Sequence, residues 1–450
     1  MPRKLISKVV AHLLVVMGVL LSVPIASALT IDEAVATSLR NNKDLRAAYF
    51  EIEKARGRLL QAGLWPNPEL EIAGTTDRTF NNEKEGVFSA EFMQAFPLAG
   101  RLRRAKNVAR VDVARALVEI RNRERLLIGE VQRAFIEVLA SADRIAFRQN
   151  QVGSGQELVD LASKRLAAGQ ASSVEANTAQ IDIARLRQEI ALIEVDRRTA
   201  QLLLRQRLGM TPEAALSVEG TLGEVTQTLA AAPVPGGAVT LRPDVHDLVL
   251  AGDRARAEAT LARAEAWENL RVGLGVERET EANEMGGTDN MGFLGLRVSV
   301  PLPLWNRNQG RVAESLATAE QAGAQVEALK LTIRSEIATA RERARLLNEV
   351  LGSYDKQVLP LLQQSIDTLR SGYAAGQTNL ADVIQNRVQQ FSLQASQVEA
   401  RRNYALALVD LQTASGGSRF LKTDYLVRRT KRDRTDSAPS FKKTSKPSSR

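Results

Sequence analysis

The amino-acid sequence predicts a mainly α-helical chain that also supplies four strands to a transmembrane β-barrel. Three observations predict this fold class. Two helical runs are far longer than ordinary globular helices, four short stretches alternate apolar and polar residues, and the whole plan occurs twice along the 450 residues. Aromatic residues make up only 4% of the chain, which suits long, thin coiled-coil helices better than a thick globular core.

The first 28 residues have the pattern of a cleaved signal peptide. A basic segment precedes a short apolar run, and Ala26-Ser27-Ala28 follows as an A-x-A cleavage site. No later segment has the roughly 18 unbroken apolar residues of a membrane-spanning helix. Cysteine is absent, which excludes disulfides, thiolate ligands and a lipidated N-terminus. We therefore expect an exported protein that is not lipidated.

The net charge of +9 is concentrated at the two ends of the chain. The signal segment holds three positive charges, and the stretch from Arg428 to Arg450 has nine basic and two acidic residues. Subtracting both contributions leaves the body near −1, without the basic face of a nucleic-acid-binding domain. We expect no nucleic-acid partner, and we expect residues 418–450 to form a basic, disordered tail.

The two halves of the chain are copies of one plan. The segment at Asn41 matches the one at Leu241, the segment at Ala95 matches the one at Pro301, and "AAGQ" occurs in both halves. The offsets of 200, 206 and 207 residues indicate an internal duplication. The first repeat is assigned to 29–240 and the second to 241–417, joined near the Gly/Pro-rich "APVPGGAV". Each repeat has the order helix, two strands, very long helix, turn, long helix.

Two helical runs are the longest predicted elements, from about Gly100 to Arg165 and from about Gln309 to Tyr373. Each is on the order of 100 Å long at 1.5 Å per residue, and Pro360 is the only proline in either run. In the second run, apolar or small residues recur at the three- and four-residue spacing of coiled-coil packing. This seam consists of Val326, Ile333, Ile337, Ala340, Ala344, Leu347, Leu351, Tyr354 and Val358.

Four stretches have the period-two alternation of β-strands, at about 67–77, 87–96, 270–280 and 291–303. Strands of about ten residues that are apolar on one face and polar on the other are typical of transmembrane barrels. Alternation alone leaves open half-buried hairpins on a small soluble domain. The apolar positions are Leu70, Ile72, Phe88, Ala90, Phe92, Phe96, Val272, Leu274, Val276, Leu294, Leu296, Val298 and Val300, and the opposite faces carry Glu69, Glu71, Glu91, Arg271, Glu277, Arg297 and Ser299.

The ends of the predicted strands favour the membrane. Long polar loops, "DRTFNNEKEG" and "ETEANEMGGTDN", lie at one end of each pair, and Trp65, Trp267 and Trp305 lie at the other. Tryptophans at that level form an aromatic belt against membrane lipid. Four strands cannot close a barrel, and open edges do not occur in lipid. Because barrels begin at about eight strands, the chain must oligomerise; two or three copies both satisfy this requirement.

Catalytic chemistry is not indicated. His246 is the only histidine beyond the signal segment, and without a cysteine or a second histidine no transition-metal site of usual composition can form. Phosphate-binding, nucleophile-elbow and metalloprotease motifs are absent from the sequence. We expect a protein that is not an enzyme, with no catalytic residues, no metal ligands and no cofactor.

The combination resembles the TolC-type outer-membrane efflux family from Leu29 to about Gly417. The motifs that carry the resemblance are "LTIDEAVATSLRNN", "WPNPELEI", "FPLAGRLRRA", "RLAAGQAS" and "YAAGQTNLADVIQ", and "FPLAGRLRRA" with "PLPLWNRNQGRV" is most similar to the cobalt–zinc–cadmium (CzcC-like) branch. The resemblance implies a homotrimer with a twelve-stranded barrel in the outer membrane of a Gram-negative bacterium and a periplasmic α-barrel of long helices. It also implies a periplasmic adaptor and an inner-membrane, proton-driven pump of the RND type as partners.

The resemblance places a periplasmic gate and the adaptor-contacting tips at the two "AAGQ" turns. The tips fall at Gly169, Gln170, Ala171 and Ser172 and at Gly376, Gln377, Thr378 and Asn379. Acids that ring the pore fall at Glu175 and Asp382, and a tyrosine of the closing network falls at Tyr373. The chain departs from the family at Gln385, where a second acid is expected, and at Thr378, where a basic residue helps to lock the closed state.

The residues themselves leave two interpretations of the acids open. Glu175 and Asp382 each lie six positions after the turn glycine, so each begins the following helix. An acid there stabilises a helix N-terminus through the macrodipole. In a ring of symmetry-related chains, the same carboxylates would concentrate cations in a narrow mouth, and their repulsion would raise some pKa values.

Three functions follow from the sequence. The first is the outer-membrane exit duct of a tripartite efflux pump, with heavy-metal cations as the expected cargo. The second is the outer-membrane channel of a type I protein or peptide secretion system. The third is a non-transporting periplasmic coiled-coil scaffold with small β-hairpins.

Overall fold

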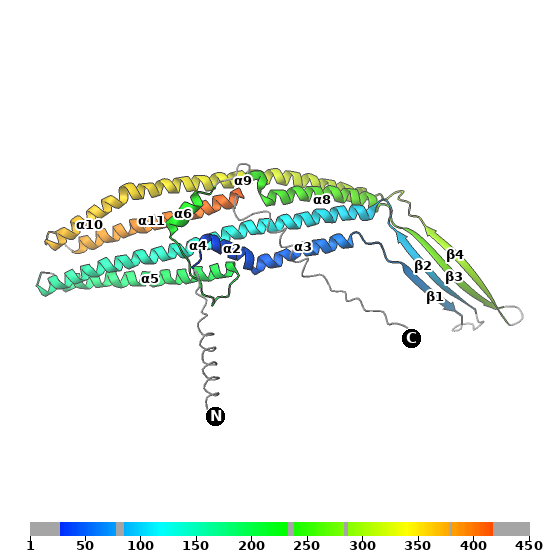
Figure 1. The fold of residues 1–450 in the computed structure, drawn as a ribbon, viewed down its shortest axis with the longest axis horizontal. Coiled ribbons are helices and arrows are strands. Elements are labelled where there is room, and N and C mark those ends of the chain that lie inside the picture. Colours follow the sequence, from blue (N-terminus) through cyan, green and yellow to red (C-terminus); the bar gives the residue numbers. More distant parts are fainter. Residues whose placement is uncertain are drawn as a thin grey trace, which may run out of the picture. The chain divides into compact units, whose positions relative to one another are not determined.

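A computed structural model describes residues 28–77, 85–170, 172–232, 238–282, 287–378 and 380–416 (Figure 1). The expected signal peptide, except Ala28, and the basic tail lie outside the described residues, as do parts of both strand-connecting loops and of the join between the repeats. The tip residues Ala171 and Asn379 also lie outside them. Within the described part, no helix is both long enough and apolar enough to cross a membrane.

Helices make up most of the described chain. Their bounds are α2 Ile31–Asn41, α3 Lys43–Gln61, α4 Arg101–Ala167, α5 Ser173–Leu208, α6 Leu222–Ala230, α7 Ala238–Leu241, α8 Pro243–Glu265, α9 Gln309–Ser353, a π-helical turn Tyr354–Val358, α10 Leu359–Ala374 and α11 Leu380–Ser415. Helix α4 has 67 residues, so it is about 100 Å long. The predicted order of elements is present in both repeats, and α6 and α7 are additions that the sequence did not predict.

The sequence predicted that the second helical run is one uninterrupted α-helix. This prediction is wrong. A π-helical turn over Tyr354–Val358 separates α9 from α10. Pro360 follows at once; its ring has no N–H to donate and would clash with the carbonyl four residues earlier in a regular helix. The predicted coiled-coil seam is confirmed along α9 and through the π-helical turn, because all nine of its residues are buried or half-buried.

The four strands form one antiparallel sheet in the order β1-β2-β3-β4. Their bounds are β1 Glu69–Thr76, β2 Gly86–Phe96, β3 Leu270–Ala282 and β4 Thr288–Ser299. The pairing of β2 with β3 joins the two repeats. Strand β4 ends at Ser299 instead of reaching the predicted residue 303, because Pro301 and Pro303 have no N–H for a ladder hydrogen bond.

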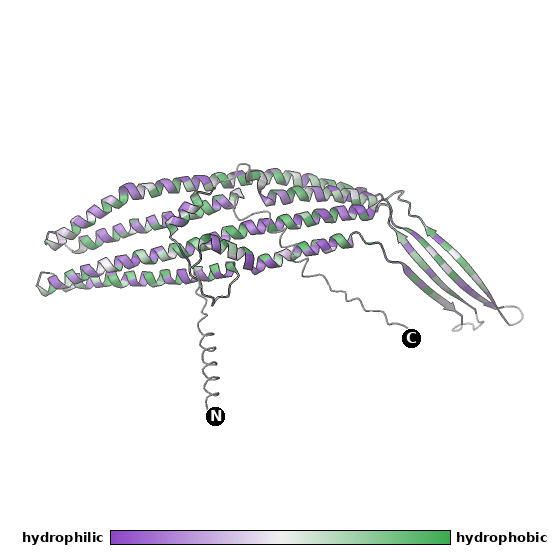
Figure 2. Ribbon diagram, in the orientation of Figure 1, coloured by the Kyte–Doolittle hydropathy of each residue, from purple (hydrophilic) through white to green (hydrophobic). Residues whose placement is uncertain are grey.

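The register places the apolar residues of all four strands on one face. Leu70 pairs with Phe92, Phe92 with Leu274, and Leu274 with Leu296, so that one apolar row crosses the sheet. The side chains of this row are between 50% and 68% exposed in the single chain, and Leu294 in the adjacent row is 81% exposed. Figure 2 shows the alternation of apolar and polar residues along each strand. We therefore expect this apolar face to contact a surface outside the single chain.

The chain divides into two compact units that do not coincide with the two repeats. The tip unit comprises the described residues of 1–43, 126–234 and 338–450, and the sheet unit comprises those of 44–125 and 235–337. Each repeat contributes to both units because α4 and α9 each run from one unit into the other. The boundaries at 29–240 and 241–417 therefore describe the duplication of the sequence and not separately packed bodies.

Ion pairs hold α8 against its neighbours in the sheet unit. Arg115 of α4 pairs with Asp247 at 3.0 Å. The guanidinium of Arg242, which is only 6% exposed, contacts Asp244 at 2.5 Å and Glu336 of α9 at 2.6 Å. His246 is exposed on the same helix. Within the described residues, no group of three or more histidine or acidic side chains is placed to hold a metal ion.

Candidate functional site at the helical tips

The two "AAGQ" segments form the same turn. The N–H of Gln170 donates to the Arg165 carbonyl and the N–H of Gln377 donates to the Gly372 carbonyl, both at 2.8 Å. Gly169 and Gly376 have φ values of +70° and +73°. These are the marks of a Schellman motif, in which a left-handed residue ends a helix and satisfies its last carbonyls. The repeated sequence therefore repeats a backbone geometry, and in Figure 1 both turns lie at the same end of the tip unit.

The side of each turn that faces away from the chain is open. Gly169, Gln170, Ser172, Gly376 and Gln377 are all exposed. A Cβ added at either glycine would have no neighbour within 4 Å. Apart from the half-buried Thr378, the described residues predicted to contact an adaptor are thus open to solvent. That role stays a prediction.

The two predicted gate acids lie in the first turns of α5 and α11. Ser172 caps α5, and its hydroxyl accepts a hydrogen bond from the backbone N–H of Glu175 at 3.3 Å. Glu175 is half-buried, whereas Asp382 in the first turn of α11 is exposed. Their positions fit the helix-dipole interpretation. The ring of carboxylates from several chains is a property of an assembly and stays a prediction.

Tyr373, the predicted member of the closing network, is buried inside one chain. It is 1% exposed, and its ring packs in an apolar cluster built from both hairpins. Burial raises the pKa of its hydroxyl; the positive charge of Arg165 opposes this change and the negative charge of Glu175 adds to it. The other buried members of the cluster are Leu158, Val159, Ala162, Ala179, Ile183 and Val383.

Arg165 is a residue of this site that the sequence did not predict, and its main contact is with Tyr373. Its Nη1 donates to the Tyr373 carbonyl at 2.9 Å, and its guanidinium carbon lies 4.7 Å from the centre of the Tyr373 ring. The only signal in the sequence is that Arg165 and Tyr373 lie at equivalent turns but at different positions of the repeat. Leu166 stands where the second repeat has Tyr373, and Gly372 stands where the first has Arg165.

The two departures from the family pattern supply no charge at the tip. Thr378 is half-buried, and its methyl carbon lies 3.4 Å from the point where a Cβ on Gly372 would be. Gln385 is exposed on α11. The predicted gate residues are therefore distributed over the described tip: Tyr373 and Glu175 interact electrostatically, while Asp382 and Gln385 are exposed on another helix.

Charged pairs fasten the second hairpin to the first along α4 and α11. Arg133 pairs with Asp410 at 2.9 Å, Arg144 pairs with Glu399 at 2.5 Å, and Arg402 pairs with Glu137. Charge-assisted hydrogen bonds of this kind are stronger than neutral ones. They set the register of α11 against α4 and so position the two turns.

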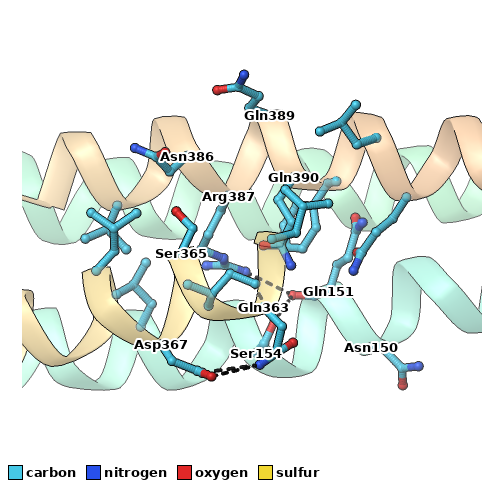
Figure 3. Close-up of a pocket in the computed structure, with 18 of the residues that line it drawn as sticks. Asn150, Gln151, Ser154, Gln363, Ser365, Asp367, Asn386, Arg387, Gln389 and Gln390 are labelled. Atoms are coloured by element: carbon cyan, nitrogen blue, oxygen red, sulfur yellow. Dashed lines mark hydrogen bonds between the residues drawn. The ribbon is translucent and has the colours of Figure 1, made fainter. Parts of the chain in front are cut away.

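A cavity of about 610 Å³ lies between α4, α10 and α11 and adjoins the Tyr373 cluster, with which it shares Leu158 and Val383 (Figure 3). Amide side chains are frequent in its wall, among them Gln151, Gln363 and Gln390. Arg387 enters from α11, where its guanidinium lies 5.1 Å from the Phe391 ring and donates to the Gln151 carbonyl at 3.3 Å.

The three tryptophans lie beside the sheet and are exposed. The exposed fractions are 60% for Trp65, 43% for Trp267 and 85% for Trp305. The Trp65 ring meets Phe96 edge-on with 5.9 Å between the ring centres. Trp65 and Trp267 lie four and three residues before β1 and β3, and Trp305 lies six residues after β4. Their contact with lipid stays a prediction.

The chain matches the family model described as "Outer membrane efflux protein" over residues 34–210 and 234–417. The protein belongs to this family. The resemblance to TolC-type efflux proteins is thereby confirmed, and it extends over both repeats. The family is one of transport proteins and not of enzymes.

Known relatives are distant but cover most of the chain. The cobalt-zinc-cadmium resistance protein CzcC of Cupriavidus metallidurans is 25% identical over 80% of this chain and 83% of its own length. The pyoverdine export outer membrane protein OpmQ of Pseudomonas aeruginosa is 24% identical, covering 86% and 85%. The cation efflux system protein CusC of Escherichia coli is 22% identical, covering 85% of each.

Solved structures confirm the predicted fold class. A crystal structure of CusC superposes with a TM-score of 0.72 at 19% identity, covering 86% of this chain and 92% of that one. The outer membrane protein VceC of Vibrio cholerae gives a TM-score of 0.64 at 18% identity, with 86% and 96% covered. These likenesses establish an efflux-channel fold of long helical hairpins joined to a four-stranded sheet.

Proposed function

We propose that this protein is the outer-membrane exit duct of a tripartite efflux system. One observation carries the proposal: an open four-stranded sheet with a continuous exposed apolar face is joined to helical hairpins that end in exposed turns. An apolar outer face suits lipid, and unpaired edges in lipid must be closed by further strands. Three chains close a twelve-stranded barrel whose helices extend into the periplasm.

The partners in this proposal are a periplasmic adaptor and an inner-membrane, proton-driven pump of the RND type. The adaptor contacts the exposed tips, and the pump delivers cargo into the helical part of the duct. Export uses a cleaved signal peptide, and the absence of cysteine fits a chain that is not lipidated. Outer-membrane family membership supports this location.

Heavy-metal cations are the proposed cargo. Relatives named for cobalt–zinc–cadmium resistance and for cation efflux, at 25% and 22% identity, support this class. Glu175 and Asp382, repeated from the three chains, would concentrate cations at the periplasmic mouth. The gate formed by these acids, with Tyr373 behind them, is part of the proposal.

A type I secretion channel is the second candidate. A relative named toxin and drug export protein A, from Aggregatibacter actinomycetemcomitans, is 22% identical over 65% of each chain. The lower coverage makes it the weaker candidate. The efflux family match favours both channel functions over a non-transporting scaffold.

Deletion of the gene in its native host tests the cargo, and fractionation of wild-type cells tests the location. We expect the deletion strain to accumulate cobalt, zinc or cadmium, measured by mass spectrometry of washed cells, and the full chain to restore wild-type levels. Metal content that does not change under any of the three metals would refute the metal proposal. A protein missing from the medium of the deletion strain would instead support the secretion channel. Recovery of the chain in the soluble periplasm would contradict both channel functions.

A further inference from the structure

Arg165 contacts both turns of one chain. Its Nη1 donates to the Tyr373 carbonyl at 2.9 Å, and its Nη2 donates to the Gln170 carbonyl at 3.5 Å. The face of the same guanidinium lies over the Tyr373 ring, with 4.7 Å to the ring centre. A single side chain of the first hairpin thus holds its own turn and the end of the second hairpin.

The carbonyl that Arg165 holds is itself part of the second turn. The N–H of Gly376 donates to the same Tyr373 oxygen at 3.0 Å. Arg165 is therefore attached to the backbone of the Schellman motif and not to a mobile side chain. Any movement of the second turn away from the first breaks a charge-assisted hydrogen bond and separates a cation from an aromatic face.

Burial strengthens this contact. Tyr373 is 1% exposed, and Nε of the half-buried Arg165 is shielded from solvent without a hydrogen-bond partner among the described residues. A cation over an aromatic ring is held more tightly when water is excluded. The hydroxyl of Tyr373 makes no hydrogen bond of regular geometry in the described part of the chain, although the nearby Arg165 side chain opposes the rise in its pKa. The contact consequently uses the ring and the carbonyl of Tyr373.

The two turns have the same backbone, but only the first repeat supplies the arginine and only the second supplies the tyrosine of this contact. The equivalent of Arg165 in the second repeat is Gly372. A Cβ added at Gly372 would lie 3.4 Å from the methyl carbon of Thr378. The equivalent of Tyr373 in the first repeat is Leu166, which is 38% exposed. The duplicated turns have thus diverged into a cation on one hairpin and an aromatic acceptor on the other.

We propose that Arg165 is the positioning residue of the gate: it clamps the second turn to the first within each chain and supplies the lock cation that position 378 lacks. The inference deepens the proposed function, on which it rests, because a clamp between the turns closes a duct only if the turns form its gate. The clamp itself is a property of one chain and can be measured separately from conduction.

Pulsed electron paramagnetic resonance measures the clamp directly. The chain has no cysteine, so spin labels at Gln170→Cys and Gln377→Cys report the distance between the two exposed turns. Co-expression with an excess of unlabelled chain keeps each labelled pair within one chain. We expect Arg165→Ala to broaden the distance distribution and Arg165→Lys, which keeps the charge but not the two-armed geometry, to broaden it less.

Two control variants separate the clamp from general damage. Lys164→Ala removes the same charge from the exposed neighbouring position and should leave the distance distribution unchanged. Tyr373→Phe keeps the ring and the carbonyl that Arg165 contacts, so it should leave the distance distribution between the two turns unchanged. If Arg165→Ala fails to assemble, Arg165→Lys and Tyr373→Phe decide the question. Broadening in Tyr373→Phe as large as in Arg165→Lys would overturn the ring-and-carbonyl clamp.

Planar-bilayer conductance of the same variants then tests the lock. We expect Arg165→Ala to raise conductance several-fold over wild type and over Lys164→Ala. An unchanged distance distribution in Arg165→Ala overturns the clamp. A broadened distribution with unchanged conductance leaves the clamp standing but overturns its role as a lock, and it places the gate of the proposed function elsewhere in the chain.

Discussion

Leu294→Arg provides the sharpest test of what covers the sheet. Leu294 lies in the middle of β4, is 81% exposed, and pairs with Val276 in an apolar row that continues to Ala90 and Ile72. If lipid covers this face, an arginine at mid-membrane costs about 2–4 kcal/mol per chain. Three independent copies per barrel would then lose on the order of 6–12 kcal/mol. On a solvent-facing hairpin the same change would cost about 0.5 kcal/mol or less.

Ser89→Arg is the matched control for this experiment. Ser89 lies one row away on the opposite face of the sheet, where it pairs with Glu277. An arginine there faces an acid and not the apolar surface. Urea-titrated folding into phospholipid vesicles, followed by the gel mobility of unheated samples, compares the two variants. Equal stability of Leu294→Arg, Ser89→Arg and wild type, to within about 0.5 kcal/mol, would refute the lipid-facing sheet.

Three further predictions concern the turns and the buried charges. Gly376→Val should lower the stability of the tip by about 1–2 kcal/mol in calorimetry, because a side chain there has open space but strains the left-handed backbone. Gly153→Val, at an equally open position of a regular helix, should not lower it. Burial alone would raise the pKa of Asp244, but the pairing with Arg242 lowers it. The stability that this pairing gives is present at neutral pH and should fall as the pH drops below about 4. Asp244→Asn should remove that pH dependence in acid-unfolding curves. Burial raises the pKa of Glu124 despite its hydrogen bond from Tyr49; its ionisation therefore costs stability as the pH rises, and Glu124→Gln should raise the melting temperature at pH 7 and not at pH 4.

The strands and the long helices were predictable because they follow simple periodicities. Alternation in β1 to β4 fixed which residues share a face, and the register confirms that face. The seam from Val326 to Val358 identified the buried side of α9 and of the π-helical turn that follows it. The π-helical turn was harder to predict, because Pro360 indicates that the helix is disturbed but not whether it bends, ends or widens.

Short helices and long-range contacts were less predictable. Helix α6 begins with a capping box in which Thr221 and Glu224 bond to each other's backbone, and this S/T-x-x-E pattern was present in the sequence. Its place in the fold depends on α11, since Gln412 donates to the Leu229 carbonyl at 2.9 Å. Such a contact joins residues 183 positions apart, and no local pattern reports it.

The tip shows the same division. The duplicated turn and its left-handed glycines could be predicted from "AAGQ", because that geometry depends only on neighbouring residues. The contact between Arg165 and Tyr373 could not, since it depends on how the two hairpins pack. Resemblance directed attention to Thr378 as the missing cation, whereas the structure has a cation on the other hairpin. A duplicated sequence can thus be symmetric in its backbone and asymmetric in its side-chain contacts.

Reversal potentials of reconstituted trimers test the central claim most directly, namely that the chain is a cation-conducting duct gated at its tips. Wild-type protein and the double variant Glu175→Ala with Asp382→Ala are recorded in planar bilayers across a salt gradient, with Glu51→Ala on α3 as the control. We predict a cation-selective pore whose reversal potential moves towards zero in the double variant and not in the control. The absence of a pore, or the same reversal potential in all three proteins, would contradict the account.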